Sequence, residues 1–432
     1  MTKKMRVAIA GLGTVGAETF RVISERKDFI LSRTGVDIEI VAVSAKHKDL
    51  DRGIDISKVS WVDDARKLSS LEDVDVVIEL IGGSEGVAKD VVEKSISAGK
   101  SVVTANKALI AHHGMAISRG IKENNVMFGY EAAVAGGIPI IKTIREGLAG
   151  NRISRIYGIL NGTCNYILTV MRETGRSFDD VLGEAQNLGY AEADPAFDIE
   201  GIDAAHKLSI LSSIAFQIPI NFPSVHVEGI EFISPIDIEF ASELGYRIKL
   251  LGIAEKSGSG IQQRVRPCLV DVTSPIAQVE GVFNAVAAEA EGLGVSLSYG
   301  RGAGAGPTTS AVVSDLIDLA AGRVTPVFGV NEEDLVNEPA WGVENLSGSY
   351  FLRLLVVDRP GVLADLTAIF RDEGVSVEAL LQRGRNPEEL VPVVLTTHET
   401  DEAAIHRSIR KFKVLESVAE DPRILPIESF KE

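Results

Sequence analysis

Short, wholly apolar runs alternate with amphipathic stretches along the first third of the chain. The run at 5–10 is followed by a helical pattern to about residue 26, and the alternation continues to about residue 131. Runs that are apolar on both faces are typical of parallel strands covered by helices on both sides. We therefore predict an α/β domain with a parallel sheet. Its strands are expected at 5–10, 37–43, 76–80, 101–104 and 126–131.

Three glycines spaced G-x-G-x-x-G follow the first of these strands. The spacing alone is a weak signal, but here a strand precedes it and a helix follows, as a dinucleotide-binding turn requires. A glycine-rich turn without a ligand is the alternative. We predict a Rossmann-type dinucleotide-binding domain. Its expected cofactor contacts lie in this turn and at later strand ends: Gly11, Leu12, Gly13, Thr14, Val15, Gly16, Gly82, Thr104 and Lys107.

The end of the second strand indicates which nicotinamide cofactor is bound. Ser44 stands where an acidic residue would bond the ribose 2′-hydroxyl of NAD, and basic residues that could meet a 2′-phosphate follow at Lys46 and Arg52. A solvated basic loop, diluted by Asp49 and Asp51, is the competing interpretation. The pattern favours NADP and leaves NAD possible.

From Glu131 onward, apolar segments rich in β-formers replace the regular alternation. A polar cluster at 161–165 separates the strand expected at 155–160 from an apolar helix expected to begin near Tyr166, and such clusters also cap helices for purely structural reasons. Further on, Asp203 and Lys207 are four residues apart on one helix face. A surface ion pair is the alternative. A lysine at the edge of an apolar core beside carboxylates is a candidate proton donor.

The last part of the chain has its own pattern. A loop-like stretch at 326–348 precedes elements in the order βαββαβ, which is ferredoxin-like. The strands are expected at 350–357, 375–382, 390–397 and 415–419, and the helices at 362–373 and 401–412.

Length and charge narrow the classes of function. The chain has 432 residues, enough for two to four domains, and its 44 basic against 61 acidic residues give a net charge of −17. Such a balance disfavours nucleic acids and anionic membrane surfaces as partners. No apolar run reaches the ~20 residues of a membrane helix and no signal-peptide core develops, so we expect a cytoplasmic protein. The cysteines, Cys164 and Cys268, lack zinc-site spacing and are expected to be packing residues.

Six motifs in order over residues 5–320 resemble the homoserine dehydrogenases. They are GLGTVG, TANK at 104–107, YEAAVAGGIPII, NGTCNYIL, LGYAEADP with its following D-x-x-x-K, and GRGAGAGPTTSAVVSDL. The resemblance implies reversible, NAD(P)H-dependent reduction of L-aspartate 4-semialdehyde to L-homoserine, in threonine and methionine biosynthesis. Two alternatives stay open: a sensor protein without chemistry, and another amino-acid dehydrogenase of the same fold. Lys107 together with the Asp203–Lys207 pair favours an enzyme.

The resemblance also implies roles for single residues. Lys207 would be the proton donor, Lys107 would line the same pocket, and Asp203 would join Glu192 in holding the substrate's ammonium group. Gly304 would return to the cofactor. The other implied substrate contacts are Asp198, Asn161, Gly162 and Thr163, and a sodium ion near the dimer interface would use Glu131, Val134, Gly136 and Ile138. Cys164 departs from the threonine that is common in the family.

The turn D-R-P-G-V-L at 358–363 resembles an ACT domain, which implies feedback by L-threonine and pairing of two copies. A dimerisation module without a ligand is the alternative. The expected effector contacts are Asp358, Pro360, Gly361 and Val362. The expected domains are dinucleotide-binding at 1–130 with about 306–325, catalytic and dimerisation at 131–305, a linker at 326–348, and ACT at 349–432, assembled as a homodimer or homotetramer.

Overall fold

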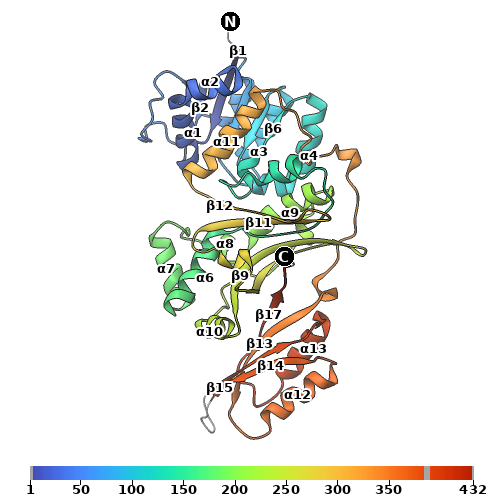
Figure 1. The fold of residues 1–432 in the computed structure, drawn as a ribbon. Coiled ribbons are helices and arrows are strands. Elements are labelled where there is room, and N and C mark those ends of the chain that lie inside the picture. The colour runs from blue at the N-terminus through green and yellow to red at the C-terminus, as the bar shows by residue number, and fades with distance from the viewer. Residues whose placement is uncertain (1–2, 384–389, 431–432) are drawn as a thin grey trace.

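The computed structural model describes residues 3–383 and 390–430 as three parts stacked along one axis (Figure 1). The N-terminal α/β part lies at one end, a mixed sheet with helices lies in the middle, and the C-terminal module lies at the other end. Within the described ranges, no helix is both long and apolar enough to cross a membrane.

The N-terminal part confirms the predicted Rossmann-type fold. Its six parallel strands have the order β3-β2-β1-β4-β5-β6, so the winding reverses between β1 and β4, where such sheets bind ligands. The strands are β1 (Lys3–Ala10), β2 (Val36–Ser44), β3 (Ser60–Trp61), β4 (Val76–Glu79), β5 (Ser101–Thr104) and β6 (Phe128–Gly129). The helices are α1 (Thr14–Glu25), α2 (Lys27–Thr34), α3 (Val87–Ser97) and α4 (Lys107–Asn124).

A helix from much later in the sequence completes this part. Helix α11 (Ala305–Ala320) lies among the N-terminal helices in Figure 1, and Val312 and Leu316 belong to the same apolar core as β1. The hydroxyls of Thr19 on α1 and Thr309 on α11 are 3.1 Å apart and buried. The chain therefore returns to its first domain after the middle sheet.

The middle part differs from the β-rich pattern expected from Glu131 onward. Residues 131–147 form short helical turns, η2 (Glu131–Ala133), α5 (Ile140–Lys142) and η3 (Thr143–Gly147). Their isoleucines are buried on all sides, and a short apolar run in that environment suits a helix as well as a strand. The helix after 155–160 begins at Gly162 rather than near Tyr166, because the Asn161 side chain caps it at Cys164 N.

Regular strands follow that region. They are β7 (Ile153–Ile159), β8 (His226–Val227), β9 (Tyr246–Ser257), β10 (Gly260–Asp271), β11 (Phe283–Ala290) and β12 (Gly294–Arg301). The helices are α6 (Gly162–Thr174), α7 (Phe178–Asn187), α8 (Ala196–Ile199), α9 (Ile202–Phe216) and α10 (Pro235–Glu243). Helix α9 is buried along nearly its whole length, so its polar residues face the protein interior.

The C-terminal module has the predicted βαββαβ order with one correction. Its elements are β13 (Ser347–Val357), α12 (Val362–Asp372), β14 (Val377–Gln382), β15 (Leu390–Thr397), β16 (Thr400–Asp401), α13 (Glu402–Phe412) and β17 (Arg423–Glu428). The last strand was expected at 415–419, which is wrong, since that stretch makes a single bridge between Val418 and Val356. The apolar segment at 423–428 forms the strand instead, because it can pair with neighbours on both sides.

Strand β17 joins the module to the middle sheet. It pairs antiparallel with β13 of the module and parallel with β10, so the two sheets form one continuous sheet. Two buried ion pairs cross the same boundary, Arg266–Glu402 at 2.6 Å and Arg353–Asp237 at 2.5 Å. The module is therefore held by more than the connecting segment.

Candidate active site

The glycine turn after β1 has the geometry of a dinucleotide site. A Cβ on Gly11 would lie 2.6 Å from Leu80 O, and one on Gly16 would lie 1.9 Å from Gly11 O, so both positions exclude a side chain. A Cβ on Gly13 would meet no described atom within 4 Å. The backbone at Gly13 is thus open at the N-terminus of α1, where free N–H groups can receive a pyrophosphate. These residues fit a nicotinamide dinucleotide.

The two basic residues after β2 are placed differently. Ser44 is buried, and Lys46 is exposed just beyond it. Arg52 donates from Nε to Leu12 O at 2.9 Å and from Nη1 to Leu50 O at 2.8 Å. Arg52 therefore ties the 46–52 loop to the glycine turn, while Lys46 is left to meet solvent or a ligand.

Glu79, which the sequence reasoning missed, lies beside Ala10, the last residue of the strand before the glycine turn. It ends β4, is fully buried, and accepts hydrogen bonds from Ile81 N, Gly82 N and Thr104 Oγ1. The Thr104 hydroxyl is thus committed to the protein interior, so any effect of this residue on a cofactor is indirect. A glutamate that ends an apolar strand before two glycines was the available signal.

The expected lysines meet at one carboxylate. Lys207 Nζ lies 2.6 Å from Asp203 Oδ2, and Lys107 Nζ lies 2.9 Å from Asp203 Oδ1. Lys107 begins α4 of the first part, whereas Asp203 and Lys207 belong to α9 of the middle part. The structure therefore joins two predicted site regions that are about a hundred residues apart in sequence.

The charges of this cluster stabilise one another. Burial alone would raise the pKa of Asp203, but the ammonium groups of Lys207 and Lys107 hold it well below its usual range. Burial opposes the charged form of Lys107, yet the Asp203 carboxylate raises the pKa of that lysine overall. Burial and the charge of Asp203 together raise the pKa of Asp198. Lys107 consequently stays an ammonium group at neutral pH.

Asn161 connects this cluster to α6. Its Nδ2 donates to Asp198 Oδ1 at 2.8 Å and to Asp203 Oδ2 at 2.9 Å, and its Oδ1 caps the helix. Gly162 approaches the backbone closely, since a Cβ there would lie 2.8 Å from Val282 O. Thr163 Oγ1 donates to Tyr190 O at 2.7 Å. The predicted polar cluster thus caps helix α6 and also contacts the carboxylates of Asp198 and Asp203.

The remaining expected residues lie around this cluster. Glu192 is exposed, and its charge helps to raise the pKa of Lys107. Cys164 is buried and its Sγ lies 3.2 Å from Asp198 O, with a thiol pKa that burial raises. Both cysteines are buried and free, as expected of packing residues. Gly304 precedes α11 with φ +113.

His206 also lies beside the cluster and was missed. It is buried between the rings of Phe197 and Phe222, with its Nε2 3.3 Å from His112 Nε2, and burial and the neighbouring His112 lower its pKa to about 4. Lys107 Nζ lies 5.5 Å from the Phe197 ring centroid. A neutral imidazole within an aromatic cluster thus lies beside the two lysines. In the sequence, nothing distinguishes His206 from the other polar residues of this largely apolar helix.

The residues expected to bind sodium surround a buried carboxylate. Glu131 accepts hydrogen bonds from Ile141 N and Lys142 N, each at 2.9 Å, and burial together with Asp315 raises its pKa to about 7. Val134, Gly136 and Ile138 are buried in the following loop. Hard oxygen donors of this kind fit an alkali cation. Among the described residues, no three His, Cys, Asp or Glu side chains cluster to hold a metal.

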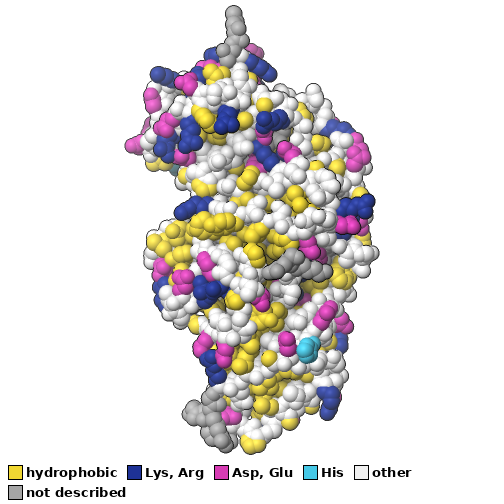
Figure 2. All heavy atoms as spheres, viewed as in Figure 1, with side chains coloured by type: hydrophobic (Ala, Val, Ile, Leu, Met, Phe, Trp, Pro, Cys, Tyr) yellow, Lys and Arg dark blue, Asp and Glu magenta, His cyan; other side chains and the backbone are white. Residues whose placement is uncertain are grey.

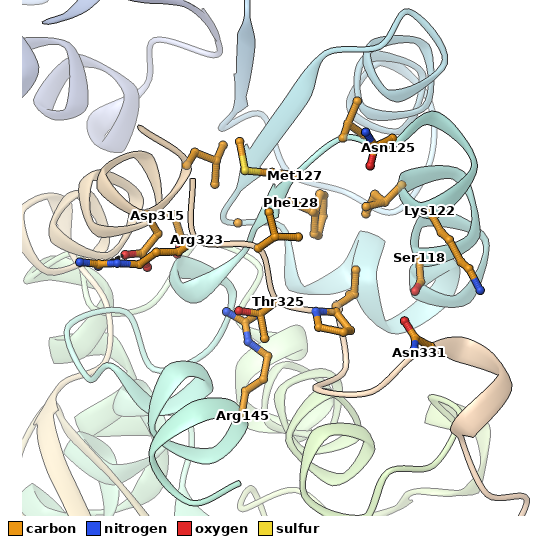
Figure 3. Close-up of a pocket in the computed structure, with 18 of the residues that line it drawn as sticks. Ser118, Lys122, Asn125, Met127, Phe128, Arg145, Asp315, Arg323, Thr325 and Asn331 are labelled. Atoms are coloured by element: carbon orange, nitrogen blue, oxygen red, sulfur yellow. Dashed lines mark hydrogen bonds and ion pairs between the residues drawn. The ribbon is translucent and has the colours of Figure 1, made fainter. Parts of the chain in front are cut away.

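A separate cavity of about 290 Å³ lies at the edge strand β6 (Figure 3). Ser118 and Lys122 reach it from α4, Asp315 from α11, and Thr325 from the segment that crosses it. None of the expected site residues lines this cavity. It is not the reaction centre.

The expected effector residues line one cavity in the C-terminal module. Its volume is about 480 Å³, and its wall includes the whole turn 358–363 together with Gln382 of β14. Gly361 has φ +99 and precedes α12. Gln382 Nε2 lies 3.4 Å from Asp358 Oδ1. The turn, the helix N-terminus and the neighbouring strand therefore enclose a space of small-molecule size.

Comparison with known proteins agrees with all three parts of the fold. A family model for homoserine dehydrogenase matches residues 139–317, one for the homoserine dehydrogenase NAD binding domain matches 11–131, and one for the ACT domain matches 350–416. The homoserine dehydrogenase of Pseudomonas aeruginosa is 44% identical over 424 residues, which are 96% of this chain and 97% of that protein.

Solved structures extend the likeness to three dimensions. A homoserine dehydrogenase from Thiobacillus denitrificans is 44% identical with a TM-score of 0.93, over 99% of this chain and 98% of that one. A hyperthermophilic archaeal homoserine dehydrogenase in complex with NADPH is 28% identical with a TM-score of 0.63, over 75% and 99%. Because the Pseudomonas and Thiobacillus proteins match nearly the full length of this chain and the family models match all three parts of the fold, the chain belongs to the homoserine dehydrogenase family of NAD(P)-dependent oxidoreductases, with a C-terminal ACT domain.

Proposed function

We propose that Lys207 and Lys107, joined through Asp203, form the reaction centre that interconverts L-aspartate 4-semialdehyde and L-homoserine. The observation that carries this proposal is the convergence of two ammonium groups on one buried carboxylate, at 2.6 Å and 2.9 Å. The nicotinamide cofactor, when bound at the glycine turn, supplies or accepts the hydride.

Lys207 supplies the proton in this proposal. Its ammonium has three donors, of which one bonds Asp203 and one bonds Leu160 O at 2.8 Å. One donor remains for the aldehyde oxygen, to which Lys207 gives a proton during reduction and from which it takes the proton back during oxidation. The positive charge of Lys107 stabilises the negative charge that develops on the same oxygen or on a neighbouring substrate oxygen.

Asp203 takes a role other than the one expected from the family resemblance. Both of its oxygens face lysines, so we assign it to orienting the two ammonium groups rather than to holding the substrate's own. Glu192, which is exposed nearby, is left for the substrate ammonium together with Asp198. The amides of Gly162 and Thr163 open helix α6 and suit the substrate carboxylate.

A direct assay tests this function. Purified full-length protein is mixed with L-aspartate 4-semialdehyde and either NADPH or NADH, and the loss of nicotinamide absorbance is followed. We expect oxidation of the cofactor that depends on the aldehyde, and the reverse reaction with L-homoserine. An enzyme that reduces other small aldehydes but not this one would contradict the assignment.

For the cofactor we propose NADP. The support is the absence of an acidic side chain at the end of β2, where Ser44 is buried, and the exposed Lys46 next to it. The archaeal relative bound to NADPH is consistent with this choice. Arg52 contributes by holding the loop against Leu12.

For the metal we propose that Glu131 and the carbonyls of the 134–138 loop hold a sodium ion. The support is the buried Glu131 carboxylate at the start of this loop, because carboxylate and carbonyl oxygens suit a hard cation. Thermal unfolding in sodium chloride and in choline chloride at equal ionic strength tests this. We expect a higher Tm in sodium, and no sodium effect in Glu131→Gln.

For the effector we propose L-threonine in the cavity behind the turn 358–363. An amino-acid carboxylate suits the open N-terminus of α12, and the cavity volume of about 480 Å³ accommodates a small amino acid. The module lies at the opposite end of the molecule from the dinucleotide site (Figure 1). Threonine would therefore act by favouring one conformation over another and not by competing with the substrate.

For the assembly we propose a homo-oligomer that pairs through β12. This strand is at the edge of the continuous sheet and exposes Val295, Leu297 and Tyr299 on alternate positions. Figure 2 shows apolar side chains gathered across the middle of the molecule, at the level of β11 and β12 in Figure 1. An apolar edge strand of this kind is a template for pairing with a second copy.

A further inference from the structure

A buried carboxylate at the end of β4 connects the turn at 81–83, which contains the expected cofactor contact Gly82, to the start of α4. Glu79 is 0% exposed and pairs in register with Ala10 of β1 and Thr104 of β5. It therefore sits at the carboxyl edge of the sheet, beside the point where the winding reverses. In residues 3–383 and 390–430 no lysine, arginine or histidine forms an ion pair with it.

Its oxygens bond two different segments. Oε1 accepts from Ile81 N at 2.7 Å and from Gly82 N at 2.9 Å, which fixes the turn that follows β4. Oε2 accepts from Thr104 Oγ1 at 2.6 Å, at the end of the next strand. One rigid carboxylate thus sets the spacing between the turn and the end of β5.

The chain of bonds continues to Lys107. Thr104 Oγ1 accepts from Asn106 N at 3.0 Å, and Asn106 Nδ2 donates to Gly83 O at 2.7 Å, back to the same turn. Asn106 Oδ1 accepts from Leu109 N at 3.0 Å and so caps α4. Lys107 is the first residue of that helix and reaches Asp203. The backbone position of Lys107 is therefore set by a closed ring of hydrogen bonds.

Fold stability alone does not account for this arrangement. Burying a carboxyl group costs free energy unless its oxygens are hydrogen-bonded, whereas apolar side chains on both sides could fill the same space without such partners. The three donors compensate the carboxylate only because the turn and Thr104 are shaped around it. What the carboxylate supplies beyond packing is a fixed separation between the turn at 81–83 and the start of α4.

We propose that Glu79, acting through Thr104 and Asn106, is a positioning residue for hydride transfer: it holds Lys107 at a fixed place relative to the bound cofactor. This inference rests on the proposed role of Lys107 in the reaction centre. Reactions between two held partners are sensitive to small displacements, and a shift of about 1 Å can cost about 100-fold in rate.

Thr104→Val tests the link, because valine keeps the shape and removes the hydroxyl. The bonds of Glu79 to Ile81 and Gly82 remain, so we expect the Kd for NADPH to change less than about threefold while kcat falls about 10- to 100-fold. Thr104→Ser restores the hydroxyl and is expected to recover most of the lost kcat. If the role of Thr104 were purely structural, Thr104→Val would lower Tm and the number of NADPH-binding sites but leave kcat per site unchanged. That result would overturn the proposal.

A double-mutant cycle with Lys107→Ala gives the decisive measurement. If Thr104 acts through Lys107, adding Thr104→Val to Lys107→Ala lowers kcat by less than about threefold more. Independent, multiplicative losses would refute the positioning role while leaving Lys107 in the reaction centre. A Lys107→Ala enzyme as active as wild type would instead refute the proposed function. Should Thr104→Val not fold, Glu79→Gln takes its place in the same cycle under the same criterion.

Discussion

At the scale of single residues, the proposed reaction centre depends on how one buried carboxylate divides its two oxygens between two lysines. Asp203 is 3% exposed. One of its oxygens pairs with Lys207 of its own helix α9, and the other pairs with Lys107 of α4. The carboxylate fixes the direction of both Nζ atoms before substrate arrives. In the proposed reaction, proton transfer to the carbonyl then depends on the one donor that Lys207 has left.

Removing that donor should affect the reaction rate and not cofactor binding. We expect Lys207→Ala to lower kcat by about 100-fold or more, the usual scale for a lost general acid, with NADPH affinity nearly unchanged. Stopped-flow or steady-state NADPH oxidation measures the first quantity and fluorescence titration the second. Lys100 offers a matched control, because it is buried like Lys207 and its ammonium group also makes two hydrogen bonds, in this case to the carbonyls of Leu71 and Val74. Lys100→Ala should lower Tm with little change in kcat.

The proposed choice of NADP also rests on a single side chain, Lys46. If the exposed Lys46 meets a 2′-phosphate, wild-type kcat/KM should favour NADPH over NADH, and Lys46→Glu should reverse the order through repulsion. The ratio of the two kcat/KM values is the measurement. Lys58→Glu changes the net charge of the same domain equally and should leave the ratio unchanged. A wild-type preference for NADH would refute the NADP assignment.

At the scale of elements, β17 is the component that couples the ACT domain to the catalytic sheet. Its last residue, Glu428, lies between Arg155 at 2.6 Å and Arg264 at 2.8 Å, one from β7 and one from β10. Burial alone would raise the pKa of Glu428, but the charges of Arg264 and Arg155 lower it to about 2. The strand is thus anchored by charge as well as by its pairing.

The pH dependence of stability follows from that pKa. The folded value of about 2 lies below the ordinary value of 4.5, so the contribution of Glu428 is present above about pH 4.5 and is lost as the pH falls toward 2. We expect Glu428→Gln to destabilise by about 1.5 to 3 kcal/mol at pH 7 and to flatten the acid slope, because Arg264 and Arg155 lose one carboxylate partner and keep only Glu255. Urea unfolding at pH 7 and pH 3 measures both effects. Glu39→Gln breaks the exposed pair with Lys4 and should cost less than about 1 kcal/mol.

At the scale of the whole molecule, the shared sheet decides how regulation can be tested. Truncation before Ser349 removes β17 from the edge of β10 and leaves Arg266 and Asp237 without their buried partners. A truncated enzyme would therefore lose stability along with the proposed effector cavity. A point substitution in the cavity is the cleaner experiment.

Gly361→Asp should weaken threonine inhibition several-fold or more. It strains a position with φ +99 and places a negative charge where the ligand carboxylate is proposed to lie. The concentration of threonine that halves activity is the measurement. Gly374→Asp is the matched control, because Gly374 also has positive φ, +75, at the other end of α12 and does not line the cavity. Equal loss of inhibition in both variants would place the effector elsewhere.

The proposed pairing through β12 concerns the assembly. We expect Leu297→Lys combined with Tyr299→Lys to convert the wild-type oligomer into a smaller species, since two lysines on an edge strand oppose pairing. Light scattering after gel filtration measures the mass. Val414→Lys is the control, because Val414 is 80% exposed and isolated from this edge. An unchanged mass in the double variant would exclude β12 as the interface.

Much of the fold and the core of the site could be predicted from local sequence. The glycine spacing after β1, the position of Lys107 after β5, and the i, i+4 spacing of Asp203 and Lys207 all depend on neighbours within one element or turn. Hydrophobic periodicity located most of the strands that were given bounds in advance to within two residues for the same reason, whereas β9 to β12 were not given bounds. These features follow from backbone geometry that repeats over a few residues.

Other features were decided only by tertiary structure. The contact of Lys107 with Asp203, the ring of bonds from Glu79, and the place of β17 between β10 and β13 each join segments distant in sequence. The same holds for the helical turns at 131–147, where burial on all sides overrides the strand preference of isoleucine. Local sequence determined the elements and the chemical groups. Long-range packing determined which groups meet, because pairing energy depends on partners that no local pattern specifies.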